Sequence, residues 1–230
     1  MGSIYAMDIL QNPHRHTGLT VDILRDIPAP STDAAAVQAL LARCPNAAET
    51  EMLQAPSIAQ ALKIARLSVK DERGRMGLGS FKALGAAYVI AHSAIVKGEA
   101  QSAKTYVTAS AGNHGLSVAA GAKAFGAASV IFLSQSVPEA FAERLIAQGA
   151  TVERAGETYE QSMSAAQAAA EDNGWTLLSD SSWPGYSDLS HRLMEGYTVF
   201  MAEADRQISA PTHREQKHHY YICQVYQISD

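Results

Sequence analysis

Short runs with the residue types of strands alternate along the chain with longer stretches rich in helix-forming residues. The alternation begins near residue 80 and continues to about residue 207. Apolar and β-branched residues dominate most of the short runs, and alanine-rich or amphipathic sequence fills the stretches between them. Strands are expected at residues 105–109, 129–133, 151–154 and 175–178, and helices at residues 80–96, 113–125, 138–148, 159–172 and 190–207.

This alternation predicts repeated strand–helix–strand units. It therefore indicates an α/β fold with a parallel sheet whose two faces are both covered by helices. In sheets of this kind the loops that follow the strands gather at one edge, where ligands bind. We therefore expect the chemistry of this protein in the loops that directly follow strands.

The pattern is less regular before residue 80. Proline interrupts the first thirty residues at Pro13, Pro28 and Pro30, which predicts an extended arm. Cap-type residues from Ser31 precede alanine-rich sequence that ends before Pro45, which predicts a short helix. The other elements expected here are a helix at residues 56–64, a strand at 67–70 and a glycine-bearing loop at 71–79.

The alternation stops after residue 213. Residues 214–219 are all polar or charged where another apolar strand is expected, and no helical pattern follows the next apolar run. We therefore divide the chain into an N-terminal arm and helix (1–49), an α/β region (50–213) and a tail (214–230).

Composition and charge exclude several classes of protein. The 230 residues include 18 Lys and Arg against 23 Asp and Glu, a net charge of −5, and 47% of them are hydrophobic. The chain can bury a core, and its scattered basic residues argue against nucleic-acid binding. No run approaches the roughly 18 apolar residues of a membrane span, and the first residues lack a secretory signal pattern. Cys44 and Cys223 lie far apart and form no CxxC spacing, which argues against a metal site. Such cysteine usage is typical of a reducing compartment, so we expect a cytoplasmic protein.

Lys82 is the first candidate for chemistry. It is expected one turn inside a helix, flanked by Phe81 and Leu84. Desolvation and the positive end of the helix dipole both disfavour an ammonium group there, and an uncharged amine can attack an aldehyde. The alternative is a solvated lysine on an amphipathic helix.

A glycine-containing turn is the second candidate. Ser110-Ala-Gly-Asn-His-Gly115 directly follows a predicted strand and opens a predicted helix. Glycines allow close backbone approach, the helix N-terminus offers unpaired N–H groups, and the Asn113 amide can donate to a phenolate or carboxylate oxygen. The turn therefore predicts an anion site, although a simple helix cap without a ligand fits the same residues.

Together these segments resemble the fold-type-II pyridoxal-phosphate enzymes, which include tryptophan synthase β, the threonine and serine dehydratases and cysteine synthase. Lys70-Asp-Glu72, Ser80-Phe-Lys-Ala-Leu-Gly85 and the turn at 110–115 stand in that family's order and spacing. Residues 71–88, with Asp180-Ser-Ser-Trp-Pro-Gly-Tyr186 and Met194-Glu-Gly-Tyr197, are similar to diaminopropionate ammonia-lyases. The resemblance covers residues 50–213.

The resemblance implies a role for each matching residue. Lys82 would bond covalently to pyridoxal 5′-phosphate and later move the proton on the substrate Cα, and Asn113 would bind the 3′ oxygen of the cofactor. Asp180 would lie near the second amine of the substrate, although a turn or helix-capping aspartate fits its position equally well. The substrate carboxylate would lie against the turn residues Ser110, Ala111, Gly112, His114 and Gly115.

The implied reaction is a β-elimination on a small amino acid. From 2,3-diaminopropionate it would release pyruvate and two molecules of ammonia. Ala111 departs from the lyase pattern, which has an aspartate there that is thought to act on the D-enantiomer. The amino-acid sequence of the turn is therefore more similar to that of threonine dehydratases. A threonine or serine dehydratase is therefore the alternative enzyme.

The end of the chain also departs from the family. Relatives continue from the segment at residues 211–213 into an apolar strand and a glycine-rich loop that holds the cofactor phosphate. We hypothesise that residues 214–230 are not family sequence and that the chain is truncated, which would weaken cofactor binding. A non-catalytic remnant is thus a further alternative. Because relatives are commonly dimers, we expect a homodimer.

Overall fold

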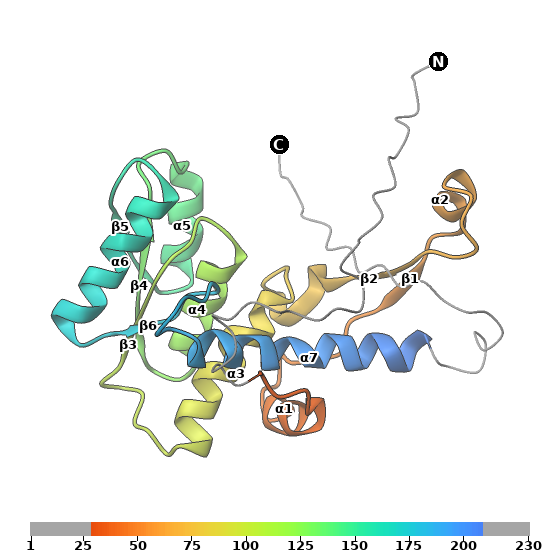
Figure 1. Cartoon of the computed structure of the whole chain (residues 1–230), viewed down its shortest axis with the longest axis horizontal. Coiled ribbons are helices and arrows are strands. Elements are labelled where there is room, and N and C mark those ends of the chain that lie inside the picture. Colours follow the sequence, from red (N-terminus) through yellow and green to blue (C-terminus); the bar gives the residue numbers. More distant parts are fainter. Residues whose placement is uncertain (1–28, 209–230) are drawn as a thin grey trace.

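Four parallel strands form the sheet that organises the molecule. The computed structural model describes residues 29–208, and in this part of the chain the strand order is β5-β4-β3-β6 (Figure 1). Strand β3 is central, with Val107 opposite Val130 of β4 and Leu177 of β6. The bounds are β3 (Thr105–Ala109), β4 (Ala128–Leu133), β5 (Thr151–Arg154) and β6 (Thr176–Leu177).

Helices cover both faces of this sheet, so the predicted fold class is confirmed. Helices α4 (Asn113–Ala124) and α5 (Glu139–Ala147) contribute to the same buried cluster as Ile131 and Leu133 of β4. Helix α6 (Tyr159–Asn173) covers the opposite face, where it packs on Val107 and Val130. Side chains that alternate along β4 thus enter two different cores, as the two-residue period of a strand requires.

Two helices cross closely beside the sheet. Helix α3 (Lys82–Ala91) packs against α7 (Asp188–Ile208), the long blue helix in Figure 1. Glycine is required at the crossing, because a Cβ at Gly196 would lie 2.7 Å from the Leu84 carbonyl oxygen. A Cβ at Gly85 would lie 2.5 Å from the ring of Tyr197. The crossing therefore fixes the first turns of α3 against the middle of α7.

A smaller unit precedes α3. Helix α1 (Ala34–Leu41) packs on α3 and α7, with the Asp33 side chain accepting hydrogen bonds from two N–H groups of its first turn. Strands β1 (Met52–Gln54) and β2 (Ser68–Lys70) form an antiparallel pair that is joined through α2 (Pro56–Ala61). The chain then passes through a 3₁₀ segment, η2 (Glu72–Gly77), into α3.

The structure corrects several predicted boundaries. Strand β1 was not expected from the sequence, and the predicted loop at 71–79 contains η2, which Asp71 caps through its side chain. The single helix expected at 80–96 divides into α3 and a π-helical continuation, η3 (His92–Val96). The predicted arm, apart from residues 29 and 30, and the predicted tail lie outside the described residues.

Residues 29–208 contain neither a membrane-spanning helix nor a cluster of metal ligands. No helix in this part is both long enough and apolar enough to cross a membrane. No group of three His, Cys, Asp or Glu side chains in the same range comes together as a metal site would require.

Candidate active site

The candidate site lies where the order of the strands reverses. The chain runs outward from β3 to β4 and β5 and then returns to the other side of β3 as β6. The carboxyl ends of β3 and β6 are therefore neighbours, and in open α/β sheets ligands usually bind beside the point where the strand order reverses. The turn at residues 110–115 follows β3, and Asp180 follows β6.

Lys82 and Asp180 meet at this edge as an ion pair. Lys82 is the first residue of α3, and its Nζ donates a hydrogen bond to Asp180 Oδ2. Both side chains are partly exposed, Lys82 by 28% and Asp180 by 22%. Sequence reasoning expected an apolar environment around the Lys82 amine, and the structure places its nitrogen beside the Asp180 carboxylate instead.

Asp180 is held in its ionised form. Burial alone would raise the pKa of its carboxyl, but in the acidic range where it titrates the charge of the His114 ring, then protonated, and the hydrogen bond from Lys82 outweigh that effect. The pKa of Asp180 therefore lies below its ordinary value. At neutral pH the site contains a fixed negative charge next to the Lys82 amine.

The turn after β3 is organised by one hydroxyl group. Ser110 Oγ accepts hydrogen bonds from the backbone N–H groups of Gly112, at 3.3 Å, and Gly115, at 3.0 Å. Gly115 has no room for a side chain, because its Cβ would lie 2.9 Å from the Ser110 carbonyl oxygen. Sequence reasoning interpreted the glycines here as allowing a close approach to the backbone. At Gly115 the group that approaches is the Ser110 carbonyl of the same turn.

The mouth of α4 is open. Gly112 is the N-cap residue of α4, and a Cβ built on it would meet nothing within 4 Å. Ala111 beside it is exposed, and the Asn113 side chain has no hydrogen-bond partner in the described part of the chain. The first turn of a helix leaves N–H groups without intrahelical partners, and these groups, with an unused amide and open space at Gly112, are what an anionic ligand needs.

His114 is buried behind the turn in one defined tautomer. Its Nε2 lies 2.8 Å from the Leu178 carbonyl oxygen, which can only accept, so Nε2 is assigned the proton in the neutral ring. Burial lowers the pKa of His114, and so the ring is neutral at pH 7. Its Nδ1 atom is buried and unpaired with respect to residues 29–208.

Two further polar groups were missed by sequence reasoning as site residues. The hydroxyls of Thr108 in β3 and Tyr197 in α7 are buried, and neither has a hydrogen-bond partner among the residues the structure places. Burial, and then the charge of Asp180, raise the pKa of Tyr197, so its hydroxyl stays protonated. Only the similarity of Met194-Glu-Gly-Tyr197 to a family signature pointed to this tyrosine.

These groups fit pyridoxal phosphate with a bound amino acid. Lys82 would offer the amine for the aldehyde, Asn113 would offer an amide for the 3′ oxygen, and the open mouth of α4 would receive the substrate carboxylate. The unpaired polar atoms of His114 and Tyr197 are the kind that a ligand satisfies. Within residues 29–208 we assign no group to the cofactor phosphate.

Comparison with known proteins agrees with this chemistry. The family model described as pyridoxal-phosphate dependent enzyme matches residues 44–225. Diaminopropionate ammonia-lyase of Salmonella typhimurium is 28% identical over 195 residues, which are 74% of this chain and 48% of that protein. The L-serine dehydratase/L-threonine deaminase of Mus musculus is 34% identical over 122 residues, 51% of this chain and 36% of that protein.

Solved structures show the same fold. Diaminopropionate ammonia-lyase from Escherichia coli, crystallised with an aminoacrylate-PLP azomethine reaction intermediate, superposes with a TM-score of 0.72 at 25% identity. That match covers 78% of this chain and 49% of the other. Threonine deaminase isoform 2 from Solanum lycopersicum gives a TM-score of 0.62 at 21% identity, over 78% of this chain and 49% of that one, which supports the fold alone.

The match to the family model extends well beyond half of the sequence and includes every residue of the candidate site. The chain spans about half the length of the diaminopropionate ammonia-lyases it matches. The matched region ends at residue 225, beyond the boundary drawn at residue 213, and that boundary stays a prediction. This chain belongs to the family of pyridoxal-phosphate-dependent enzymes.

Proposed function

We propose that this chain provides the reactive lysine and the substrate turn of an ammonia-lyase that carries out β-elimination on a small amino acid, 2,3-diaminopropionate being the preferred substrate. One observation carries the proposal: Lys82 and Asp180 are paired at the carboxyl edge of the sheet, where β3 also leads into the open mouth of α4. The amine, the carboxylate and the anion site are the three groups that such a reaction needs.

Each residue would act on a different part of the substrate. Bound pyridoxal phosphate supplies an electron-withdrawing ring that makes the substrate Cα–H bond acidic. Lys82 Nζ would remove the Cα proton, while the N–H groups at the start of α4 hold the substrate carboxylate and fix its orientation. His114 is buried, neutral and hydrogen-bonded to the Leu178 carbonyl, so it would fill the space behind the turn and exclude water from it.

Asp180 supports a diamine substrate in particular. Its carboxylate is ionised at neutral pH and partly buried, so it complements a β-ammonium group better than the neutral hydroxyl of serine or threonine. A charge-assisted hydrogen bond would also orient the β-nitrogen so that it departs as ammonia. The similarity to diaminopropionate ammonia-lyases points to the same substrate.

A serine or threonine dehydratase is the second candidate. Ala111 supports it, because the diaminopropionate lyases resembled here have an aspartate at that point of the turn. An alanine cannot exchange a proton with the substrate, so activity on a D-enantiomer is not expected in either case. The 34% identity to the mouse L-serine dehydratase/L-threonine deaminase supports the same reading over a shorter stretch.

An assay of 2-keto-acid release tests the proposal. The full chain, supplied with pyridoxal phosphate, should release pyruvate faster from L-2,3-diaminopropionate than from L-serine, and 2-ketobutyrate slowly from L-threonine. Lys82→Ala should abolish release, whereas Lys123→Ala, which removes an exposed lysine at the far end of α4, should not change it. Asp180→Asn should raise KM for diaminopropionate more than for serine.

Three outcomes would count against this assignment. Faster release from serine or threonine would favour the dehydratase. Release that survives Lys82→Ala would show that another residue reacts. No release from any of the three amino acids, with no uptake of cofactor, would favour a non-catalytic remnant.

A further inference from the structure

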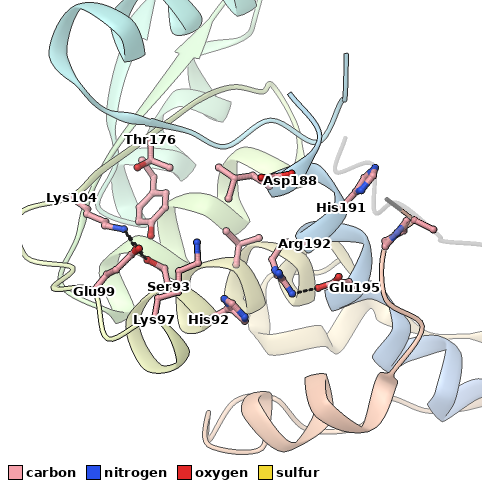
Figure 2. A pocket seen from close by; sticks show the side chains of 15 residues that line it. His92, Ser93, Lys97, Glu99, Lys104, Thr176, Asp188, His191, Arg192 and Glu195 are labelled. Carbon is pink, nitrogen blue, oxygen red and sulfur yellow. Dashed lines mark hydrogen bonds and ion pairs between the residues drawn. The ribbon is translucent and has the colours of Figure 1, made fainter. Parts of the chain in front are cut away.

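Strand β6 ends before it reaches Asp180. It contains only Thr176 and Leu177, and Thr176 lines a cavity at the amino edge of the sheet (Figure 2). The N–H of the next residue, Leu178, still donates to the Val107 carbonyl of β3 at 2.8 Å. Asp180 follows two residues later, so something other than strand pairing must fix the position of its carboxylate.

The hydroxyl of Tyr186 continues the hydrogen bonding at the end of the strand. It accepts a hydrogen bond from the Ser179 N–H and donates one to the Leu177 carbonyl, each at 2.9 Å. Between these two groups, the Leu178 carbonyl lies 2.8 Å from the Nε2 atom of His114. Leu178 and Ser179 are fully buried, so the Leu178 carbonyl and the Ser179 N–H depend on these side chains for bonds that water cannot supply.

Tyr186 is itself held in place by a tight turn. Its N–H donates to the Trp183 carbonyl at 2.8 Å, and its carbonyl accepts from the Trp183 N–H at 3.1 Å. Pro184 and Gly185 connect the two residues, and the φ angle of +87° at Gly185 is what the third position of a type II turn requires. The two rings stack with 4.4 Å between their centroids. The chain from Leu177 to Tyr186 is therefore a closed loop whose ends are joined by one phenol.

Asp180 lies within this loop and faces several titratable groups. Among the described residues, those that interact with its charge are Lys82 of α3, His114 of α4, Tyr159 of α6, Tyr197 of α7 and Tyr186 of the loop itself. Burial, and to a smaller extent the charge of Asp180, raise the pKa of Tyr186 to about 12, against the opposing effect of the hydrogen bond from Ser179. The Tyr186 hydroxyl therefore keeps its proton at neutral pH and can donate it to the Leu177 carbonyl.

We infer that Tyr186 is a positioning residue for Asp180, because its hydroxyl joins the end of β6 to the loop that brings this carboxylate to Lys82. The effect on the reaction rests on the function proposed above, whereas the placement of Asp180 beside Lys82 does not. Without the hydroxyl, the Ser179 N–H and the Leu177 carbonyl lose their common partner, and the loop can move Asp180 away from the amine. A displaced carboxylate would bind a β-ammonium group less well, while a substrate without that group would be affected less.

A carboxyl NMR titration tests the placement without catalysis. The full chain would be isotope-labelled at its aspartate carboxyl carbons, and the Asp180 signal assigned with an Asp180→Asn variant. Burial acts to raise the pKa of Asp180, and the charge of the His114 ring and the hydrogen bond from Lys82 lower it. In Tyr186→Phe the carboxylate moves away from both, so we expect its pKa to rise toward the ordinary value.

Tyr106→Phe is the matched control. Tyr106 also has a buried, hydrogen-bonded hydroxyl, which donates to Gln101 Oε1 at 2.8 Å, but it lines the cavity of Figure 2 at the amino edge of the sheet. A general loss of packing would affect both variants alike, whereas only Tyr186→Phe should move the pKa of Asp180. If Tyr186→Phe does not fold, Trp183→Leu, which removes the stacked ring and keeps the hydroxyl, should raise the same pKa by a smaller amount. A constant Asp180 pKa in the variant that folds, or an equal shift in Tyr106→Phe, would overturn the inference.

Steady-state kinetics separates positioning from a general structural role. With cofactor added, Tyr186→Phe should raise KM for L-2,3-diaminopropionate about tenfold, as expected for one weakened charge-assisted bond, and change KM for L-serine much less. Combined with Asp180→Asn it should add nothing further, because it acts through that carboxylate. Equal rises for both substrates, or additive effects in the double variant, would overturn the inference. If the chain releases no keto acid at all, the proposed function fails, and the NMR titration still decides the placement of Asp180.

Discussion

Two groups of buried polar side chains differ in how completely they are paired. Near the end of α7, Glu203 joins Arg75, Lys70 and Glu72 in a closed network of ion pairs. Further toward its beginning, beside the candidate active site, the Tyr197 hydroxyl and His114 Nδ1 are buried without partners in the described region. Helix α7 therefore contributes Glu203 to a satisfied polar network and Tyr197 as an unsatisfied hydroxyl.

The satisfied network anchors the segment that leads to the reactive lysine. Arg75 in η2 is fully buried and lies 2.7 Å from Glu72 Oε2 and 2.6 Å from Glu203 Oε2. Lys70 Nζ lies 2.8 Å from the same Glu203 oxygen and donates to the Thr50 carbonyl at 2.6 Å. The network thus ties β2 and η2, directly before α3, to the end of α7.

The difference separates structural polar groups from ligand-binding ones. An unpaired buried hydroxyl or ring nitrogen costs stability unless a ligand completes it, whereas a fully paired network holds the backbone in place. We therefore expect substitutions in the network to reduce stability, and removal of an unpaired group to reduce activity while stability is kept or improved.

Arg75→Met should have the largest effect on stability. It leaves Glu72 and Glu203 buried without their common partner, and breaking a buried ion pair in this way costs about 3–5 kcal/mol. Arg73→Met is the matched control, because Arg73 pairs with Asp71 at the surface, where water and salt screen the pair and little stability is lost with it. Urea denaturation gives both values. Equal losses in the two variants would mean that the network is not structural.

Acid should have the second-largest effect on stability, because it weakens the same network. Burial acts to raise the pKa of Glu203, but hydrogen bonds from Arg75 and Lys70 outweigh it, so its folded pKa lies below the ordinary 4.5. As the pH falls, the unfolded chain therefore binds this proton before the folded chain does. The contribution of the Glu203 carboxylate to the free energy of unfolding is complete above pH 4.5 and declines as the pH falls toward the folded pKa. Unfolding measured between pH 6 and about pH 3 should show this decline. Glu203→Gln, less stable throughout, should show a shallower one, and identical slopes would contradict the assignment.

Tyr197→Phe should give the smallest change in stability, with the opposite sign. The substitution removes a buried hydroxyl that has no partner in the described residues and keeps the ring packed on Phe81, at 4.9 Å between centroids. We expect an unchanged or higher free energy of unfolding, by up to about 1 kcal/mol, together with a lower rate of keto-acid release. A loss above that size would mean that the hydroxyl is already satisfied in the folded chain.

Much of the sheet was predictable from the sequence. The runs at residues 105–109 and 151–154 became β3 and β5 with those bounds, because their strand propensity and flanking turns agree with the fold. Strand β1 was missed because three residues, Met52–Gln54, show no period and are ordered by pairing with β2. The end of α3 was misplaced because the change to a π-helical turn at η3 leaves no mark in helix propensity.

The site was predictable only as far as its residues lie in local motifs. Lys82 and the turn at 110–115 stand in short segments that can be recognised, and the structure brings Lys82 together with Asp180. That pair spans 98 positions of sequence, and the contact of His114 with Leu178 spans 64. No local pattern encodes such contacts, since the packing of α3 against α7 and the strand order create them.

Covalent trapping of the cofactor tests the central claim most directly. The full chain would be mixed with pyridoxal phosphate, reduced with borohydride, and digested for peptide mapping by mass spectrometry. We predict that the reduced cofactor is found on the peptide that contains Lys82 and that Lys82→Ala removes it, while Lys123→Ala leaves it in place. Modification spread over exposed lysines, or unchanged in Lys82→Ala, would contradict the claim that this edge of the sheet holds the cofactor.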